Sequence, residues 1–265
     1  MFAKNWKCVV SLAVLALFLT AVQAQAVLVN VDLNAGRTLS GNNFTSWSPT
    51  FTGAAVVGTG TQTWNALNRL TNNANPQTGS LAGLLDSDGN PSAVTLSAFS
   101  IPNGDFRDSI PGAVYGVSPA PPATDNGYNL LMGDRAAGGG QASVTISGVP
   151  AGPWDLYVFG WAGCAWQVTD GASPTQRLGW TVAYDGSDAQ MNASSMVDGT
   201  TYVHFSGTHV AGTDLLLFSD TDGAASNGYG QVRFAGFQLT VIPEPATLML
   251  IAVGVPFLLK RRRNA

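Results

Sequence analysis

Two short loops rich in aspartate carry the groups of this sequence most suited to metal chemistry. One loop runs from Asp86 to Asn90 and the other from Asp220 to Gly223. Carboxylate and amide oxygens suit Ca²⁺, which extracellular modules bind weakly. The candidate calcium ligands are Asp86, Asp88, Asn90, Asp220 and Asp222. Neither loop has the spacing of an EF-hand, and Asp-Gly is also common in tight turns, so a turn without metal is the alternative.

Tryptophans supply a second kind of candidate site. The C–H face of a sugar ring stacks on an exposed indole, and loops at strand ends often carry binding residues. Trp161 and Trp166 flank four small residues at the end of an expected strand. They are candidate polysaccharide-binding residues, although packing in the core or anchoring of a loop is the favoured interpretation for each.

The sequence contains few residues arranged as in known active sites. Residues 27–242 contain no glutamate, so a hydrolase would need a pair of aspartates, and nothing in the sequence selects such a pair. The two histidines, His204 and His209, lie five residues apart near an expected strand. They would therefore face opposite sides and make no metal pair. We expect a protein without enzyme activity, and keep an aspartate-based hydrolase as the less favoured alternative.

The charge of residues 27–242 limits the partners. Fifteen aspartates against six arginines, with no lysine, give this span a net charge of −9. Nucleic acid is excluded as a partner, because phosphate contacts need Lys and Arg. Aspartate without glutamate or lysine also disfavours exposed helices and favours strands and loops.

Alternating apolar residues predict many short strands separated by Gly, Asn, Asp and Pro. The expected strands lie near residues 29–33, 94–98, 144–147, 154–161, 178–184, 202–205, 215–218 and 232–241. Two long polar regions, 35–80 and 101–141, separate some of them, with short edge strands such as 54–57 or 128–132 as the alternative to loop. One or two helical turns are expected at 80–85. The pattern predicts an all-β antiparallel β-sandwich of the jelly-roll kind.

Residues 27–242 are expected to form one domain. Their number, 216, fits a single β-sandwich or barrel. Cys164 is the only cysteine between residues 27 and 242, so we expect no internal disulfide.

The N-terminus has the composition of a secretory signal peptide. Lys4 and Lys7 precede an apolar stretch from Cys8 to Leu19, and cleavage is expected after Ala24 or Ala26. We assign residues 1–26 to a signal helix; a first membrane helix would need a longer apolar run.

The C-terminus has the composition of a sorting segment. Pro243, Glu244 and Pro245 precede an apolar run from residue 246 to 259. The cations that follow are Lys260, Arg261, Arg262 and Arg263. As a helix the run would span about 21 Å, short for a membrane core of about 30 Å, and the cations would hold its end in the cytoplasm.

Residues 243–265 resemble the PEP-CTERM sorting signal of exported bacterial proteins, also called the ice-binding protein C-terminal motif. The resemblance implies an exosortase-type membrane transpeptidase as a partner, with cleavage near the motif and transfer to the cell surface or exopolysaccharide matrix. An unprocessed membrane anchor is the alternative.

A second resemblance concerns the fold. The turn Gly148-Val149-Pro150-Ala151-Gly152 joins two expected strands and resembles a hairpin of galactose-binding-like jelly rolls. We thus expect residues 27–242 to form an exported jelly-roll ectodomain, anchored in the membrane before processing. It would be a non-catalytic surface or matrix protein that binds polysaccharide, with no cofactor except calcium; a structural matrix component without a ligand is the alternative.

The sorting interpretation predicts that the mature surface form lacks the basic tail from residue 260 to 265. Mass spectrometry of C-terminal peptides from native cells would measure this. Recovery of the intact tail on most molecules would contradict processing.

Overall fold

The structure is a computed structural model that describes part of the chain in detail. The described residues are 26–33, 50–53, 56–58, 62–67, 77–101, 104–108, 134–138, 141–160, 165–171, 173–179, 196–220 and 232–242. Residues Val27–Val241 form one compact unit. These ranges contain strands and turns and no helix, which confirms the all-β class.

The two terminal segments lie outside the described residues, so the signal peptide, the sorting signal and the membrane helix stay predictions. Within the part of the chain that is described, no helix has the length and apolar character needed to cross a bilayer.

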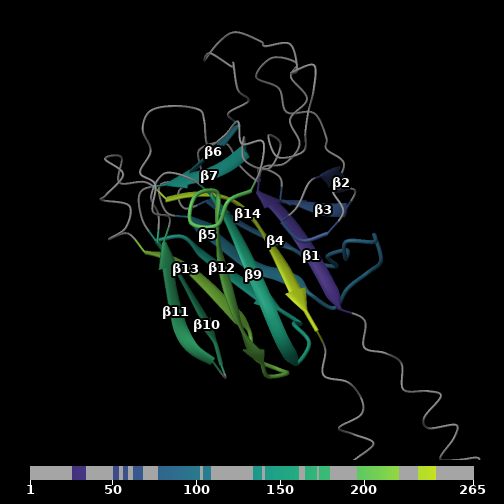
Figure 1. Cartoon of the computed structure of the whole chain (residues 1–265). Coiled ribbons are helices and arrows are strands. Elements are labelled where there is room, and N and C mark those ends of the chain that lie inside the picture. Colours follow the sequence, from purple (N-terminus) through teal and green to yellow (C-terminus); the bar gives the residue numbers. More distant parts are fainter. Residues whose placement is uncertain are drawn as a thin grey trace, which may run out of the picture. The chain divides into compact units, whose positions relative to one another are not determined.

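Strands follow one another along the whole unit (Figure 1). Their bounds are β1 Val27–Leu33, β2 Thr50–Gly53, β3 Gln62–Leu67, β4 Gln77–Leu81, β5 Thr95–Ile101, β6 Gly104–Asp108, β7 Asp134–Gly138, β8 Ser143–Ser147, β9 Gly152–Gly160, β10 Ala165–Asp170, β11 Ser173–Gly179, β12 Tyr202–His209, β13 Leu215–Asp220 and β14 Val232–Val241.

The strands form two sheets. The 8-stranded sheet has the order β12-β9-β14-β1-β3-β2, and β7 joins it by pairing with β14 and β6. The 6-stranded sheet has the order β11-β10-β13-β8-β5-β4. Most neighbours are antiparallel, and β1 and β3 run parallel. Two sheets rich in antiparallel pairs agree with the predicted β-sandwich.

The core lies between the sheets and is built by alternation along each strand. In β9, Trp154, Leu156 and Val158 are buried while Asp155 and Tyr157 are half-buried. Burial of a large apolar side chain contributes about 1.5–3 kcal/mol. The largest fully buried side chains are Trp64, Trp154, Trp166, Phe99, Phe159, Phe205, Phe234 and Phe237.

The connection after β8 corrects one expectation. Strands β8 and β9 belong to different sheets, so the Gly148 to Gly152 turn is a crossover between sheets and not a hairpin. Gly148 has a φ of 69°, and a Cβ there would lie 2.1 Å from the carbonyl oxygen of Ala93. The turn therefore requires glycine at this position.

One further expectation was wrong. The helical turn expected at 80–85 is absent, because β4 runs to Leu81, Gly83 lies in a bend and Leu85 forms a bridge with Pro91. The regions 35–80 and 101–141 also contain β2, β3, β4, β6 and β7, so they are not simply long polar loops. Among these strands, β3 lies between β1 and β2 and carries the buried side chains of Trp64 and Leu67.

Buried amides cover part of the outer face of the 8-stranded sheet. Gln238 of β14 donates to the Oδ1 atom of Asn30 on β1 at 2.7 Å, and its own oxygen accepts from the amide of Val56 at 2.8 Å. Asn30 donates in turn to the carbonyl of Thr63 on β3 at 2.8 Å. These bonds hold β3 and the bend at Val56 against β1 and β14.

Asp32 lies two residues further along the same outer face and is fully buried. Neither of its carboxyl oxygens has a hydrogen-bond partner in the described structure. Burial raises the pKa of Asp32 well above its ordinary value, because a charged carboxylate loses its hydration there. The folded chain therefore holds Asp32 in its neutral form to a higher pH than the unfolded chain does.

The raised pKa of Asp32 makes stability depend on pH. Below about pH 3.9 the carboxyl is neutral in both states and carries no penalty. Above that pH the unfolded chain releases a proton that the folded chain retains, so stability falls until the folded pKa is passed. Asp32→Asn should thus gain stability relative to the parent as the pH rises above the ordinary pKa of an aspartate. Urea unfolding at several pH values would measure this, and a relative loss as pH rises would contradict it.

Candidate functional site

The first aspartate loop is a turn closed by its own side chain. Asp86 Oδ1 accepts from the backbone amides of Asp88 at 2.9 Å and Asn90 at 2.8 Å. Gly89 follows with a φ of 85°, and its amide donates to the carbonyl of Asp86. An aspartate that caps its own turn is sufficient to explain this composition.

The second aspartate loop lies mostly outside the described residues. Asp220 ends β13, where it pairs with Ala165, and Asp222 is not described. Among the described residues, no three His, Cys, Asp or Glu side chains are grouped so that they could hold a metal ion. Calcium binding at either loop stays a prediction.

The structure describes one of the two candidate tryptophans, Trp166, and places it in the core. Trp166 lies on β10 and is fully buried, with its ring 4.7 Å from that of Phe234. Alternation turns Trp166 into the core between the sheets, which agrees with the packing interpretation and not with an exposed binding residue. Trp161 lies outside the described residues.

The two histidines face opposite sides of β12, as their spacing predicts. His204 points outward with 36% of its side chain exposed, and its Nε2 atom lies 2.8 Å from Asp155 Oδ1. His209 points inward, is fully buried, and its Nδ1 atom lies 3.2 Å from Asp170 Oδ1. One edge strand therefore carries a surface Asp–His pair and a core Asp–His pair.

The surface pair belongs to a strip of aromatic rings on β9 and β12, which we call the tyrosine strip. It consists of Tyr157, Tyr202 and His204. The rings of Tyr157 and His204 stack with centroids 4.5 Å apart and an interplanar angle of 4°. Tyr202 meets Tyr157 edge to face at 5.8 Å. Such contacts fix the rings on the sheet face before any ligand arrives.

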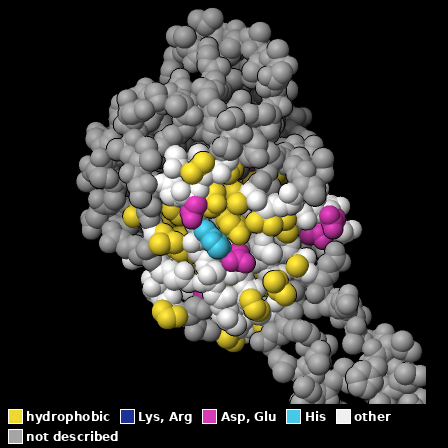
Figure 2. Space-filling model, in the orientation of Figure 1, with side chains coloured by type: hydrophobic (Ala, Val, Ile, Leu, Met, Phe, Trp, Pro, Cys, Tyr) yellow, Lys and Arg dark blue, Asp and Glu magenta, His cyan; other side chains and the backbone are white. Residues whose placement is uncertain are grey.

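The tyrosine strip lies on the surface of the molecule. Figure 2 shows one histidine between two groups of acidic side chains, with apolar side chains around them. Because His209 is buried, the exposed histidine is His204. The side chain of Asp155 is 40% exposed, and Asp198 is exposed just before β12.

Burial and nearby carboxylates raise the pKa values of the two tyrosines in the strip. Burial, followed by the charges of Asp155, Tyr202 and Asp198, raises the pKa of Tyr157. Burial and then the charge of Asp198 raise the pKa of Tyr202. Both phenols therefore remain protonated at neutral pH and can donate a hydrogen bond to a ligand.

The pairing register of β9 and β12 explains why the sequence pattern alone does not predict the tyrosine strip. Alternation in β9 and β12 does place Asp155, Tyr157 and His204 on outer faces. Their contact depends on β9 pairing with β12, which sets His204 opposite Tyr157 and Tyr202 opposite Phe159. The two strands are separated by β10 and β11 in the sequence, and nothing local indicates their partnership.

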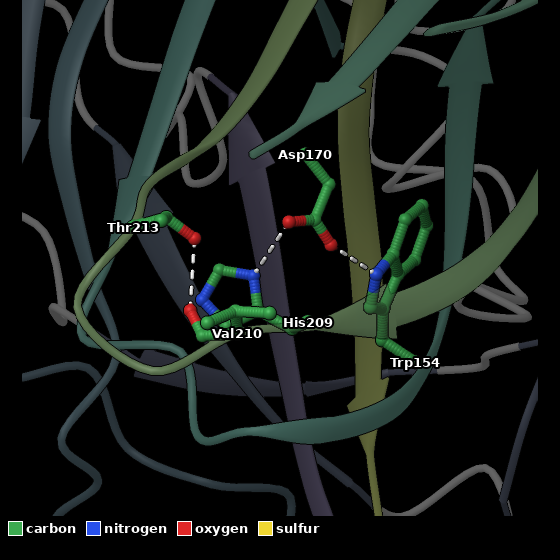
Figure 3. Close-up of polar contacts among 5 residues, drawn as sticks. All are labelled: Trp154, Asp170, His209, Val210 and Thr213. Carbon is green, nitrogen blue, oxygen red and sulfur yellow. Dashed lines mark hydrogen bonds and ion pairs between the residues drawn. The ribbon is translucent and has the colours of Figure 1, made fainter. Parts of the chain in front are cut away.

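The buried pair ties the sheets together (Figure 3). Asp170 of β10 accepts from Trp154 Nε1 of β9 at 2.7 Å, and its other oxygen lies against His209 of β12. In the turn after His209, Thr213 Oγ1 donates to the carbonyl of Val210 at 2.8 Å. Asp170 and His209 are closed to solvent, so this pair suits packing and not contact with a substrate.

The contrast between the two pairs predicts different costs of removal. Asp170→Ala deprives two buried donors of their acceptor and should cost about 2–5 kcal/mol of unfolding free energy. The matched variant Asp155→Ala breaks the half-exposed pair and should cost less than about 1 kcal/mol. Urea unfolding of both variants would test this, and equal losses would contradict the assigned roles.

Comparison with known proteins identifies no family for the chain. No family model matches the sequence, and no curated protein matches it. Among solved structures, the chain is similar to the crystal structure of the plant receptor-like kinase FER, with 9% sequence identity and a TM-score of 0.38. The match covers 83% of this chain and 43% of the kinase chain, so the sequence spans less than half the length of that protein.

Proposed function

We propose that the protein is an exported surface or matrix protein that binds polysaccharide without catalysis, through the tyrosine strip. The observation that carries this proposal is the row of preorganised rings on the sheet face: His204 stacked on Tyr157 at 4.5 Å, with Tyr202 edge-on. Sugar rings offer C–H faces to such surfaces, and protonated phenols supply hydrogen bonds to hydroxyl groups.

The arrangement favours binding over turnover. Asp155, a surface carboxylate beside the rings, has its Oδ1 atom 2.8 Å from His204 Nε2. The other Asp–His pair is buried in the core, where no polymer reaches it. Sites that bind without reacting need rings and hydrogen-bond groups fixed in place, and the strip supplies both.

Strand order supports a jelly roll as the finer description of the sandwich. The strands β1, β8, β9, β10, β11, β12, β13 and β14 form the rows β1-β14-β9-β12 and β8-β13-β10-β11. Such interleaved Greek keys are typical of eight-stranded jelly rolls, a fold that serves many lectin domains. The remaining strands are an insertion between β1 and β8.

Export and surface sorting complete the proposal. The N-terminal signal pattern and the Pro243-Glu244-Pro245 segment with its basic tail support passage across the membrane and delivery by an exosortase-type transpeptidase. The destination would be the cell surface or the extracellular matrix, where polysaccharide is abundant.

Binding to a panel of immobilised polysaccharides tests the proposal. Tyr157→Ala removes the central ring and should weaken binding by about 1–3 kcal/mol, the range known for stacked nucleobases, which is roughly 5- to 150-fold in Kd. Tyr157→Phe keeps the ring and should retain most of the affinity. Leu178→Ala, an exposed apolar residue on β11 of the other sheet, is the matched control.

Two results would count against the proposal. One is a complete panel without binding by the parent protein, which would favour a structural matrix role. The other is a folded Tyr157→Ala variant with unchanged affinity, which would place the ligand elsewhere.

A further inference from the structure

The tyrosine strip is bordered by negative charge. Asp155 lies beside His204 on the β9 side, and Asp198 precedes Tyr202 on β12, with a β-bridge between residues 198 and 202. Both carboxylates are on partly or fully exposed residues. A ligand lying on the rings would therefore meet carboxylates near both Tyr157 and Tyr202.

The strands that carry the strip, β9 and β12, contain no lysine or arginine. Their basic side chains are His204, which is paired with Asp155, and the buried His209. Residues 27–242 as a whole carry a net charge of −9. The field at this face thus attracts cations and repels anions. The faces of tyrosine rings add to this preference, because their π-electrons also attract cations.

Asp155 has a partner that holds it in place. The contact of His204 Nε2 with Asp155 Oδ1 fixes one oxygen, and the stacking of His204 on Tyr157 fixes the imidazole. The carboxylate is therefore positioned beside the ring and does not need to be ordered by the ligand. Preorganisation of this kind lowers the entropic cost of binding.

We propose that the ligand of the tyrosine strip is a polysaccharide bearing free primary ammonium groups, that is, an amino-sugar polymer with unacetylated amines. The inference rests on the proposed function of the strip and adds the chemical class of its ligand. Ring stacking holds the sugar, and Asp155 and Asp198 pair with ammonium groups at its edges. Acidic polysaccharides are disfavoured by the same carboxylates.

The test compares two oligomers of equal length, one of glucosamine and one of N-acetylglucosamine, in calorimetric titrations of the full chain at pH 6, where the sugar amine is charged. The glucosamine oligomer should bind roughly three- to tenfold more tightly, because ammonium groups add exposed ion pairs and cation–π contacts. The preference should shrink as salt is raised, since salt screens exposed charges.

Variants separate a built site from general attraction of a polycation to an acidic protein. Asp198→Asn and Asp155→Asn should each reduce the ratio of the affinities for the two oligomers by about two- to fivefold. Asp88→Asn makes the same change in net charge on the exposed turn after Leu85, several strands away from the strip. It should leave the preference unchanged.

The outcomes distinguish the inference from the proposed function. Equal binding of the two oligomers, with loss of both in Tyr157→Ala, would overturn the ammonium preference and leave polysaccharide binding intact. A reduction by Asp88→Asn as large as that by Asp198→Asn would overturn the site by assigning the preference to net charge. If neither oligomer binds and no polysaccharide of the panel binds, both proposals are overturned.

Discussion

The hydrogen bonds of Asp170 are the constraint on which the sandwich depends at its β10–β12 end. A carboxylate buried between two sheets would be costly if left alone, and here both oxygens are engaged by groups from the opposite sheet. Trp154 and His209 cannot shift without losing these two contacts with Asp170. The relative positions of β9, β12 and β10 are thereby fixed more narrowly than apolar packing alone would fix them.

That constraint reaches the surface through β12. The strand alternates, so the residue that faces Asp170 inside and the residues that face solvent outside share one rigid backbone. Holding His209 inside sets the register in which Tyr202 and His204 meet Tyr157 outside. The core carboxylate thus supports the geometry of the surface rings, although it lies on the other side of the sheet.

Sequence patterns predicted the fold class and most of the central strands, because strands such as Val232–Val241 alternate strongly. They did not locate the strands within 35–80 and 101–141. Most of these strands are short and rich in small or polar residues, as Gln77–Leu81 is, although β3 carries the buried Trp64. For the site, the outward positions of Tyr157 and His204 were within reach of alternation, while their contact required long-range pairing. Trp166 follows Trp161 by only five residues in the sequence, which suggested that both lie in one loop. In the structure Trp166 belongs to β10, and its position in that strand points its side chain into the core.

The free edge of β12 has one further property. A side-chain amide from the other sheet, that of Gln176 on β11, donates to the backbone carbonyl of Ser206. An uncovered edge strand invites a strand from another molecule, which leads to aggregation at high local concentration. Another copy would have to displace Gln176 before it could pair there. At high local concentration this contact would help neighbouring molecules remain separate, each with its ring surface uncovered.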